Sequence, residues 1–115
     1  MKIRPFPLLL ILACLLVACG RAAANEATIK MEAMRFYQDE ITVAAGQPVT
    51  LRLVNQDGYA HAFDIDELDI HLPLAANETA ELSFTPKKTG RYPFYCSSPG
   101  HHAAGMVGTL IVAPE

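Results

Sequence analysis

The chain has 115 residues, of which 51% are hydrophobic and 18% are charged, and this length favours one domain. Nine basic residues against twelve acidic ones give a net charge of −3. Loss of Lys2 and Arg4 with an N-terminal leader would leave seven basic residues against twelve, so nucleic acid is not an expected partner.

The first eighteen residues have the pattern of a leader rather than of a folded segment. Basic residues at positions 2 and 4 precede an apolar run at 8–18, which is too short to span a bilayer comfortably. No later segment is long and apolar enough to be a membrane helix. We therefore expect a signal peptide over residues 1–18 and export from the cytoplasm.

The apolar run ends in Leu-Val-Ala-Cys-Gly, which resembles the bacterial lipoprotein signal. In that signal the cysteine becomes the lipidated N-terminus, so we expect a lipid on Cys19 and attachment to a membrane. A short linker over 19–26 and a folded domain over 27–115 would follow. The alternative is ordinary cleavage after the alanines at 22–24.

The remaining residues form short runs with strand-like alternation, separated by turn residues. Val49, Leu51 and Leu53, for example, alternate with polar residues along one run. We predict seven strands, at residues 27–31, 40–43, 49–54, 60–65, 79–85, 90–96 and 107–112. Residues 66–77, which include a proline, are expected to form an irregular link. The pattern predicts an all-β fold, either a β-sandwich or a small barrel.

The cysteines give the sharpest restriction on function. Cys14 would leave with the leader, and Cys19 would be lost or acylated, so Cys96 is the single thiol of the domain. An idle free thiol is a liability in an oxidising compartment. A lone cysteine there is buried and inert, paired between chains, catalytic or bound to a metal.

Around Cys96 the chain reads F-Y-C-S-S-P-G-H-H-A-A-G-M-V-G. Four residues separate Cys96 from His101, and four more separate His101 from Met106, all on one loop between two predicted strands. Thiolate, imidazole and thioether donors together suit copper, whereas zinc rarely uses methionine. A further ligand is needed, and His61 is the best candidate because it follows a turn cluster. Two histidines, a cysteine and a weak axial methionine make an electron-transfer copper site.

The motif Y-C-x4-H-x4-M-x-G, from Tyr95 to Gly108, resembles the cupredoxin family of small blue copper proteins, with a spacing like that of rusticyanin and sulfocyanin. The upstream pattern N-x-D-x3-H-x-F at 55–63 also matches, so the resemblance covers the whole exported domain. It implies a Greek-key β-sandwich or barrel. It also implies one copper ion with four ligands: His61, Cys96, His101 and Met106.

The stretch G-R-Y-P-F-Y-C also resembles the copper domain of cytochrome oxidase subunit II. The dinuclear site of that domain needs a second cysteine in the loop, where this chain has Ser97 and Ser98, so we expect a mononuclear site. Many cupredoxins place Asn or Ser after the first histidine to tie the ligand loops together. Here that position is Ala62, so we expect Asn55 or backbone amides to serve instead.

Several other residues invite a functional interpretation, and simpler ones are favoured. His102 is expected to face solvent, His71 to lie on the surface of the irregular link, and Met31 to be a core residue. The acidic run is expected to be a solvated face, with docking of a basic redox partner as the alternative. It consists of Asp64, Asp66, Glu67 and Asp69.

The resulting hypothesis is an electron carrier at the extracytoplasmic face of a membrane. A cytochrome or a terminal oxidase would dock on an apolar rim at Pro99, Ala103 and Ala104, beside the edge of His101. The alternative is a copper chaperone or storage protein that delivers copper to an oxidase. An enzyme is not expected, because multicopper oxidases need H-x-H clusters and a second domain.

Overall fold

The computed structural model describes residues 25–115, so the predicted signal peptide and Cys19 lie outside the described residues. Over this range the chain forms nine strands and one short 3-10 helix, η1 (Asp66–Leu68). The strands are β1 (Glu26–Glu32), β2 (Arg35–Phe36), β3 (Glu40–Ala44), β4 (Val49–Asn55), β5 (His61–Ile65), β6 (Ile70–Leu74), β7 (Thr79–Phe84), β8 (Gly90–Tyr95) and β9 (Val107–Ala113). Within residues 25–115 the chain contains no helix with the length and apolar character needed to cross a membrane.

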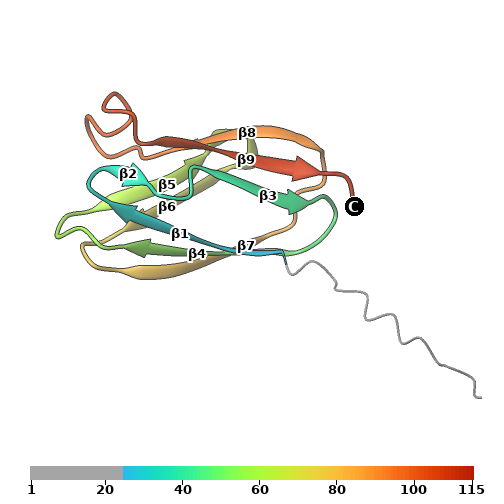
Figure 1. Cartoon of the computed structure of the whole chain (residues 1–115), viewed down its shortest axis with the longest axis horizontal. Coiled ribbons are helices and arrows are strands. Elements are labelled where there is room, and N and C mark those ends of the chain that lie inside the picture. The colour runs from blue at the N-terminus through green and yellow to red at the C-terminus, as the bar shows by residue number, and fades with distance from the viewer. Residues whose placement is uncertain (1–24) are drawn as a thin grey trace, which may run out of the picture.

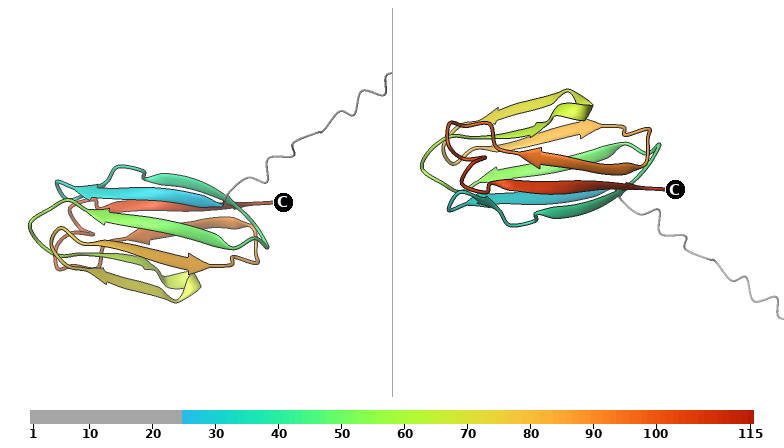
Figure 2. Two further views of the ribbon diagram at one scale, coloured as in Figure 1. Left: turned by 90° about the horizontal axis from the view of Figure 1, so that it is seen from below. Right: turned by 90° about the horizontal axis from the view of Figure 1, so that it is seen from above.

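The strands form two sheets packed face to face, as Figure 1 shows, and Figure 2 presents the molecule from below and from above. One sheet has the order β2-β1-β4-β7 and the other has the order β3-β9-β8-β5-β6. The pairs β1–β4 and β3–β9 are parallel, and the other pairs are antiparallel. The predicted all-β sandwich is confirmed.

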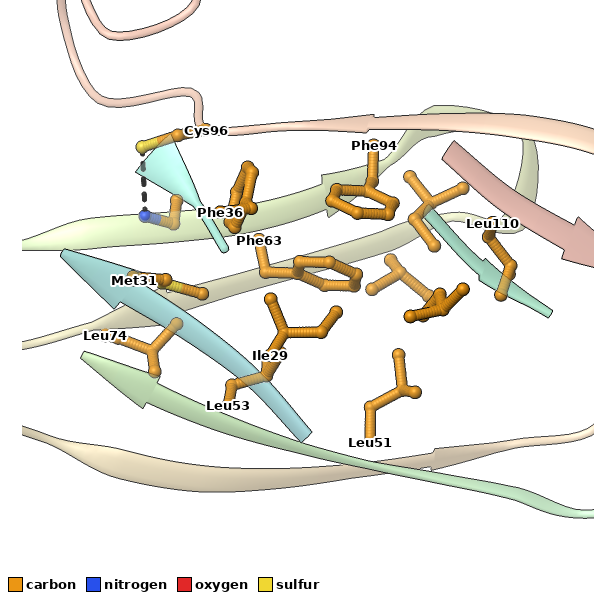
Figure 3. Packing of buried hydrophobic residues seen from close by; sticks show 14 of the residues in the cluster. Ile29, Met31, Phe36, Leu51, Leu53, Phe63, Leu74, Phe94, Cys96 and Leu110 are labelled. Atoms are coloured by element: carbon orange, nitrogen blue, oxygen red, sulfur yellow. Dashed lines mark hydrogen bonds between the residues drawn. The ribbon is translucent and has the colours of Figure 1, made fainter. Parts of the chain in front are cut away.

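The core lies between the two sheets, and its residues are the inward-facing members of the alternating runs (Figure 3). Val49, Leu51 and Leu53 have no exposed surface, which confirms the alternation predicted for β4. Phe94 packs against both Phe36 and Phe63, with ring centroids 5.1 and 5.0 Å apart. This aromatic group fills the space beneath β8, the strand that leads into Cys96.

The sequence-based prediction was wrong for residues 66–77, which are not an irregular link. Ile70–Leu74 forms β6, which pairs with β5 at the edge of the five-stranded sheet. Pro73 obscured this strand, but an edge strand accommodates proline because one of its sides makes no ladder hydrogen bonds. The two-residue strand β2 was also missed. It pairs with β1 across a tight turn at Ala33 and Met34, both at positive φ.

The β1–β2 turn, the β4–β5 turn and the long β8–β9 loop meet at one end of the sandwich, together with the β6–β7 connection. Figure 1 shows that β1 begins, and the C-terminus lies, at the opposite end. Loops fixed by strand ends give side chains well-defined positions. The residues predicted as metal ligands all lie at the end where these connections meet.

Candidate metal centre

The β8–β9 loop is closed at its base by its own backbone. Cys96 N donates to Met106 O at 3.1 Å, and Met106 N donates to His101 O at 3.1 Å. Gly100 and Gly105 have φ values of +81° and +92°, which let the chain reverse direction twice within the loop. The spacing of four residues therefore folds into a compact loop that holds its predicted ligands close to one another.

His61 reaches the site from the second connection, because it is the first residue of β5. The next residue, Ala62, donates its backbone N–H to Cys96 Sγ at 3.3 Å, the contact that is dashed in Figure 3. His61 is buried, with 1% of the residue exposed, and Cys96 is fully buried. A backbone hydrogen bond thus joins the two connections at the sulfur atom.

Three donor atoms converge at this point. His61 Nδ1 lies 3.1 Å from His101 Nδ1 and 3.8 Å from Cys96 Sγ, and Cys96 Sγ lies 3.4 Å from His101 Nδ1. Atoms at these separations lie on a circle with a radius of about 2.0 Å, close to the metal–nitrogen bond length of about 2.0–2.1 Å. The three donor atoms are therefore spaced closely enough to surround one transition-metal ion.

Met106, the fourth predicted ligand, is fully buried at the end of the loop. Its backbone is hydrogen-bonded to both Cys96 and His101. A buried thioether, a cysteine sulfur and two imidazoles make a donor set that favours copper, and the backbone bonds keep Met106 next to the other two loop residues. The donor chemistry of the site therefore fits the metal that the sequence predicts.

Two features were expected to replace the usual Asn or Ser, and only the first joins the ligand loops directly, whereas the second stabilises the β4–β5 turn. The first is the Ala62 amide. The second is Asn55, whose Nδ2 donates to Tyr59 O at 2.8 Å and Ala75 O at 2.9 Å, while its Oδ1 accepts from Asp57 N at 3.0 Å. Asn55 thus fixes the β4–β5 turn from inside and positions His61.

Sequence reasoning missed Asp57, whose carboxylate Oδ2 lies 2.7 Å from His61 Nε2. Burial raises the pKa of Asp57, but hydrogen bonds from His61 and from the Ala33 and Met34 amides outweigh it, so the pKa lies below its usual value. The only sequence signal was its place in the N-x-D-x3-H pattern. The carboxylate therefore stays charged beside the proposed ligand.

The two adjacent histidines of the loop differ as predicted. His101 is half-buried, and its ring stands edge-on to Tyr59, with centroids 6.0 Å apart. His102 is exposed, and its ring lies over Tyr95 at 4.7 Å, away from the three donors. Tyr59 also packs against His61 at 5.1 Å, so one aromatic side chain covers both of the proposed histidine ligands.

Some of the remaining minor predictions are confirmed and others are wrong. Met31 is a fully buried core residue, as expected. The acidic run is not wholly a solvated face, because Asp64 is 3% exposed and accepts from Ser97 N at 3.1 Å. His71 is exposed as predicted, but it lies on β6, and its Nδ1 is 3.0 Å from the second oxygen of Asp64. Asp64 thus joins the edge strand to the residue after Cys96.

Comparison with known proteins agrees with this geometry. The family model of the Cupredoxin-like domain matches residues 7–112. The chain is 39% identical over 106 residues to chloroplastic plastocyanin of Physcomitrium patens, which covers 80% of the chain and 61% of that protein. It is 28% identical over 116 residues to the copper-resistant cuproprotein CopI of Rubrivivax gelatinosus, covering 81% of the chain and 70% of CopI.

A solved structure extends the similarity to three dimensions. Auracyanin A of Chloroflexus aurantiacus, described as a "blue" copper protein, superposes with a TM-score of 0.66 at 26% identity. The superposition covers 76% of the chain and 98% of auracyanin A. The chain thus spans nearly the whole of auracyanin A and less than two thirds of the moss plastocyanin. Together with the match of the family model, this establishes that the chain belongs to the cupredoxin-like domain family.

Proposed function

We propose that this protein is an electron carrier with one copper ion held by His61, Cys96, His101 and Met106. The observation that carries the proposal is the triangle of His61 Nδ1, His101 Nδ1 and Cys96 Sγ, whose sides of 3.1–3.8 Å match one metal ion. When bound, copper supplies one-electron chemistry by alternating between Cu(I) and Cu(II). The chain's part is to hold the donor atoms rigidly and to exclude water.

The surface around the site supports brief docking of a redox partner. Pro99, Ala103 and Ala104 are exposed on the same loop as His101, which is itself only half-buried. A small apolar rim of this kind suits the weak, short-lived encounters of redox proteins. The proposed partner is a cytochrome or a terminal oxidase, and the electron would pass through the edge of His101.

The direct test is addition of Cu(II) to the purified protein, followed by visible and EPR spectroscopy. We expect an intense visible band from the bond between the Cys96 thiolate and copper, and its loss in Cys96→Ser and His101→Gln. His102→Gln is the matched control and should keep the band, because His102 points away from the donor atoms. Absence of the band from the unmutated protein would refute the proposal.

Met106→Leu tests the fourth ligand separately. The two side chains have similar volumes, so the buried position should stay filled. If Met106 is a weak axial ligand, the visible band should persist while the reduction potential rises, because the axial ligand tunes the potential of such sites. An unchanged potential would remove Met106 from the ligand set and leave the other three ligands in place.

A second function, copper handling, is favoured by the similarity to CopI, whose name describes copper resistance. The same residues would then bind copper for delivery or storage rather than for redox cycling. The two functions differ in their stable metal states. A reversible Cu(II)/Cu(I) couple with a visible band supports the carrier, and tight Cu(I) binding without such a band supports copper handling.

We further propose export, with a signal peptide at 1–18, a lipid on Cys19, a linker over 19–26 and the copper domain over 27–115. The support is the sequence pattern and the position of β1, which begins at the end of the sandwich opposite the candidate site (Figure 1). An anchor before β1 would leave the site free to meet partners. Fatty-acid labelling of the full chain in bacterial cells should mark it, and Cys19→Ser should abolish the label.

A further inference from the structure

Asp57 lies between the proposed ligand His61 and the β1–β2 turn, and it contacts both. Its Oδ2 is 2.7 Å from His61 Nε2 and 3.5 Å from Met34 N, and its Oδ1 accepts from Ala33 N at 3.0 Å. The Asp57 side chain is 12% exposed and the His61 side chain is fully buried. A largely dehydrated carboxylate therefore faces the nitrogen of His61 that points away from the candidate metal site.

This contact determines which ring nitrogen of His61 carries the proton. An ionised carboxylate only accepts hydrogen bonds, so Nε2 must carry the hydrogen that lies between the two groups. In the neutral ring Nδ1 is then unprotonated, and its lone pair faces Cys96 Sγ and His101 Nδ1. The carboxylate selects the tautomer that can bind a metal through Nδ1.

The carboxylate also contributes charge to the site. A hydrogen bond to an ionised acceptor is roughly twice as strong as one between neutral groups, and it makes the imidazole a more basic donor. A negative charge next to a ligand stabilises Cu(II) more than Cu(I), because Cu(II) carries the larger positive charge. The charge of Asp57 therefore favours the oxidised state of the proposed centre.

We propose that Asp57 is a positioning residue for the metal centre: it fixes the tautomer and ring plane of His61 and lowers the reduction potential of bound copper. The inference rests on the proposed function. The carboxylate is in turn held by the backbone amides of Ala33 and Met34. These two residues have positive φ values of 52° and 58°. Through Asp57, the β1–β2 turn becomes part of the support of the copper site.

Two variants distinguish the effect of the Asp57 charge from the effect of its hydrogen bond to His61. Asp57→Asn keeps an oxygen that can accept from His61 Nε2 but removes the charge, and Asp57→Ala removes both. Asp69→Asn is the matched control, because it removes the same charge from a fully exposed residue that also has positive φ, which asparagine tolerates. All variants keep the predicted ligands unchanged.

The first readout needs no metal. Nitrogen-15 NMR of the His61 ring in metal-free protein should show the Nε2–H tautomer in the unmutated chain and a mixture of tautomers in Asp57→Ala. The second readout is the reduction potential, which should rise in Asp57→Asn beyond any change in Asp69→Asn. In Asp57→Asn the affinity for Cu(II) should fall by about 10–100-fold, and the affinity for Cu(I) should fall by less.

The outcomes distinguish this inference from the proposed function. Equal potentials for Asp57→Asn and Asp69→Asn in blue, copper-loaded protein would overturn the inference and leave the electron-carrier proposal intact. Failure of the unmutated protein to form a blue centre would overturn the function, and the potential-lowering role with it. The tautomer would still test the positioning role. If Asp57→Ala does not fold, Asp57→Asn decides the test alone.

Discussion

The β8–β9 loop and the β4–β5 turn bring residues to the same site, but they are held in different ways. The loop is held mostly by its own backbone, through bonds such as Ala104 N to Gly100 O and Met106 N to His101 O. The turn is held by side chains, since Asn55 and Asp57 bind backbone groups far away in the sequence. The loop is therefore a local structure, whereas the turn depends on the rest of the fold.

The largest expected effect comes from breaking the turn at Asn55. Asn55→Ala removes three hydrogen bonds in a place where Asn55 is 2% exposed. At about 1 kcal/mol for each bond, the free energy of unfolding should fall by about 3 kcal/mol. Urea denaturation of the metal-free protein measures this. The control is Gln56→Ala at the exposed neighbouring position, which should change the free energy of unfolding little. A loss no larger than that of the control would show that the turn does not need Asn55.

Gly108, at the base of the loop, is expected to give the next largest effect. A Cβ at this position would clash with the Phe94 ring and lie 2.6 Å from Asp39 O, a backbone atom that cannot easily move. Gly108→Ala should therefore lower the free energy of unfolding by about 2 kcal/mol through overpacking. This close approach also accounts for the glycine that ends the M-x-G motif.

Gly58, in the turn, is the matched control for Gly108. An added Cβ would have no atom within 4 Å, and no positive φ requires a glycine there. Gly58→Ala should leave stability unchanged or raise it slightly, because alanine restricts the unfolded chain. A comparable loss in both variants, measured by thermal unfolding, would contradict the packing explanation for Gly108.

The contrast between loop and turn also explains what could be predicted from the sequence. Cys96, His101 and Met106 were found together because a local loop keeps the ligand spacing in the sequence itself. The contact of Asp57 with His61 left a trace in the N-x-D-x3-H pattern, but its bonds from the Ala33 and Met34 amides did not, because the pairing of β1 with β4 alone brings these residues near. Long-range partners leave no spacing rule to read.

The same reasoning applies to the fold. β4 was predicted correctly because one of its faces is buried, so its apolar residues alternate. β6 was missed because an edge strand with Pro73 buries only its two end residues, Ile70 and Leu74. Asp64 was misjudged for a related reason. Its acidic neighbours are exposed, but its own side chain points inward to Ser97 and His71.

A smaller effect, with the opposite sign, is expected in the β1–β2 turn. Ala33 and Met34 form a two-residue hairpin turn with both φ values positive, which favours Asn-Gly over Ala-Met. Ala33→Asn should raise the free energy of unfolding by about 0.5–1 kcal/mol, because asparagine adopts this conformation at lower cost than alanine. Thermal unfolding measures the gain.

The matched control for this turn is Ala104→Asn in the β8–β9 loop, an exposed position without positive φ. It should give no gain in stability. Equal stabilisation by the two substitutions would mean that the turn is not strained. In that case the conformation at Ala33 would contribute nothing to how firmly Asp57 is held.

The smallest effect on stability is expected at His71, an exposed residue of β6. Its partner Asp64 also accepts a hydrogen bond from Ser97 N, in the β8–β9 loop. A hydrogen bond to Asp64 raises the pKa of His71 above 6.5, although partial burial opposes it. Because the folded-state pKa is the higher one, protonated His71 stabilises the fold fully below about pH 6.5, and this contribution is lost as the pH rises through the folded-state pKa. His71→Gln should therefore be less stable than the unmutated protein at pH 6, with a difference that shrinks towards pH 9. Urea denaturation of metal-free protein at both pH values measures this difference. A difference in stability that stays constant between the two pH values would mean that the charge of protonated His71 does not stabilise the fold through Asp64. The contact between His71 and Asp64 would then act as a hydrogen bond between uncharged His71 and the carboxylate.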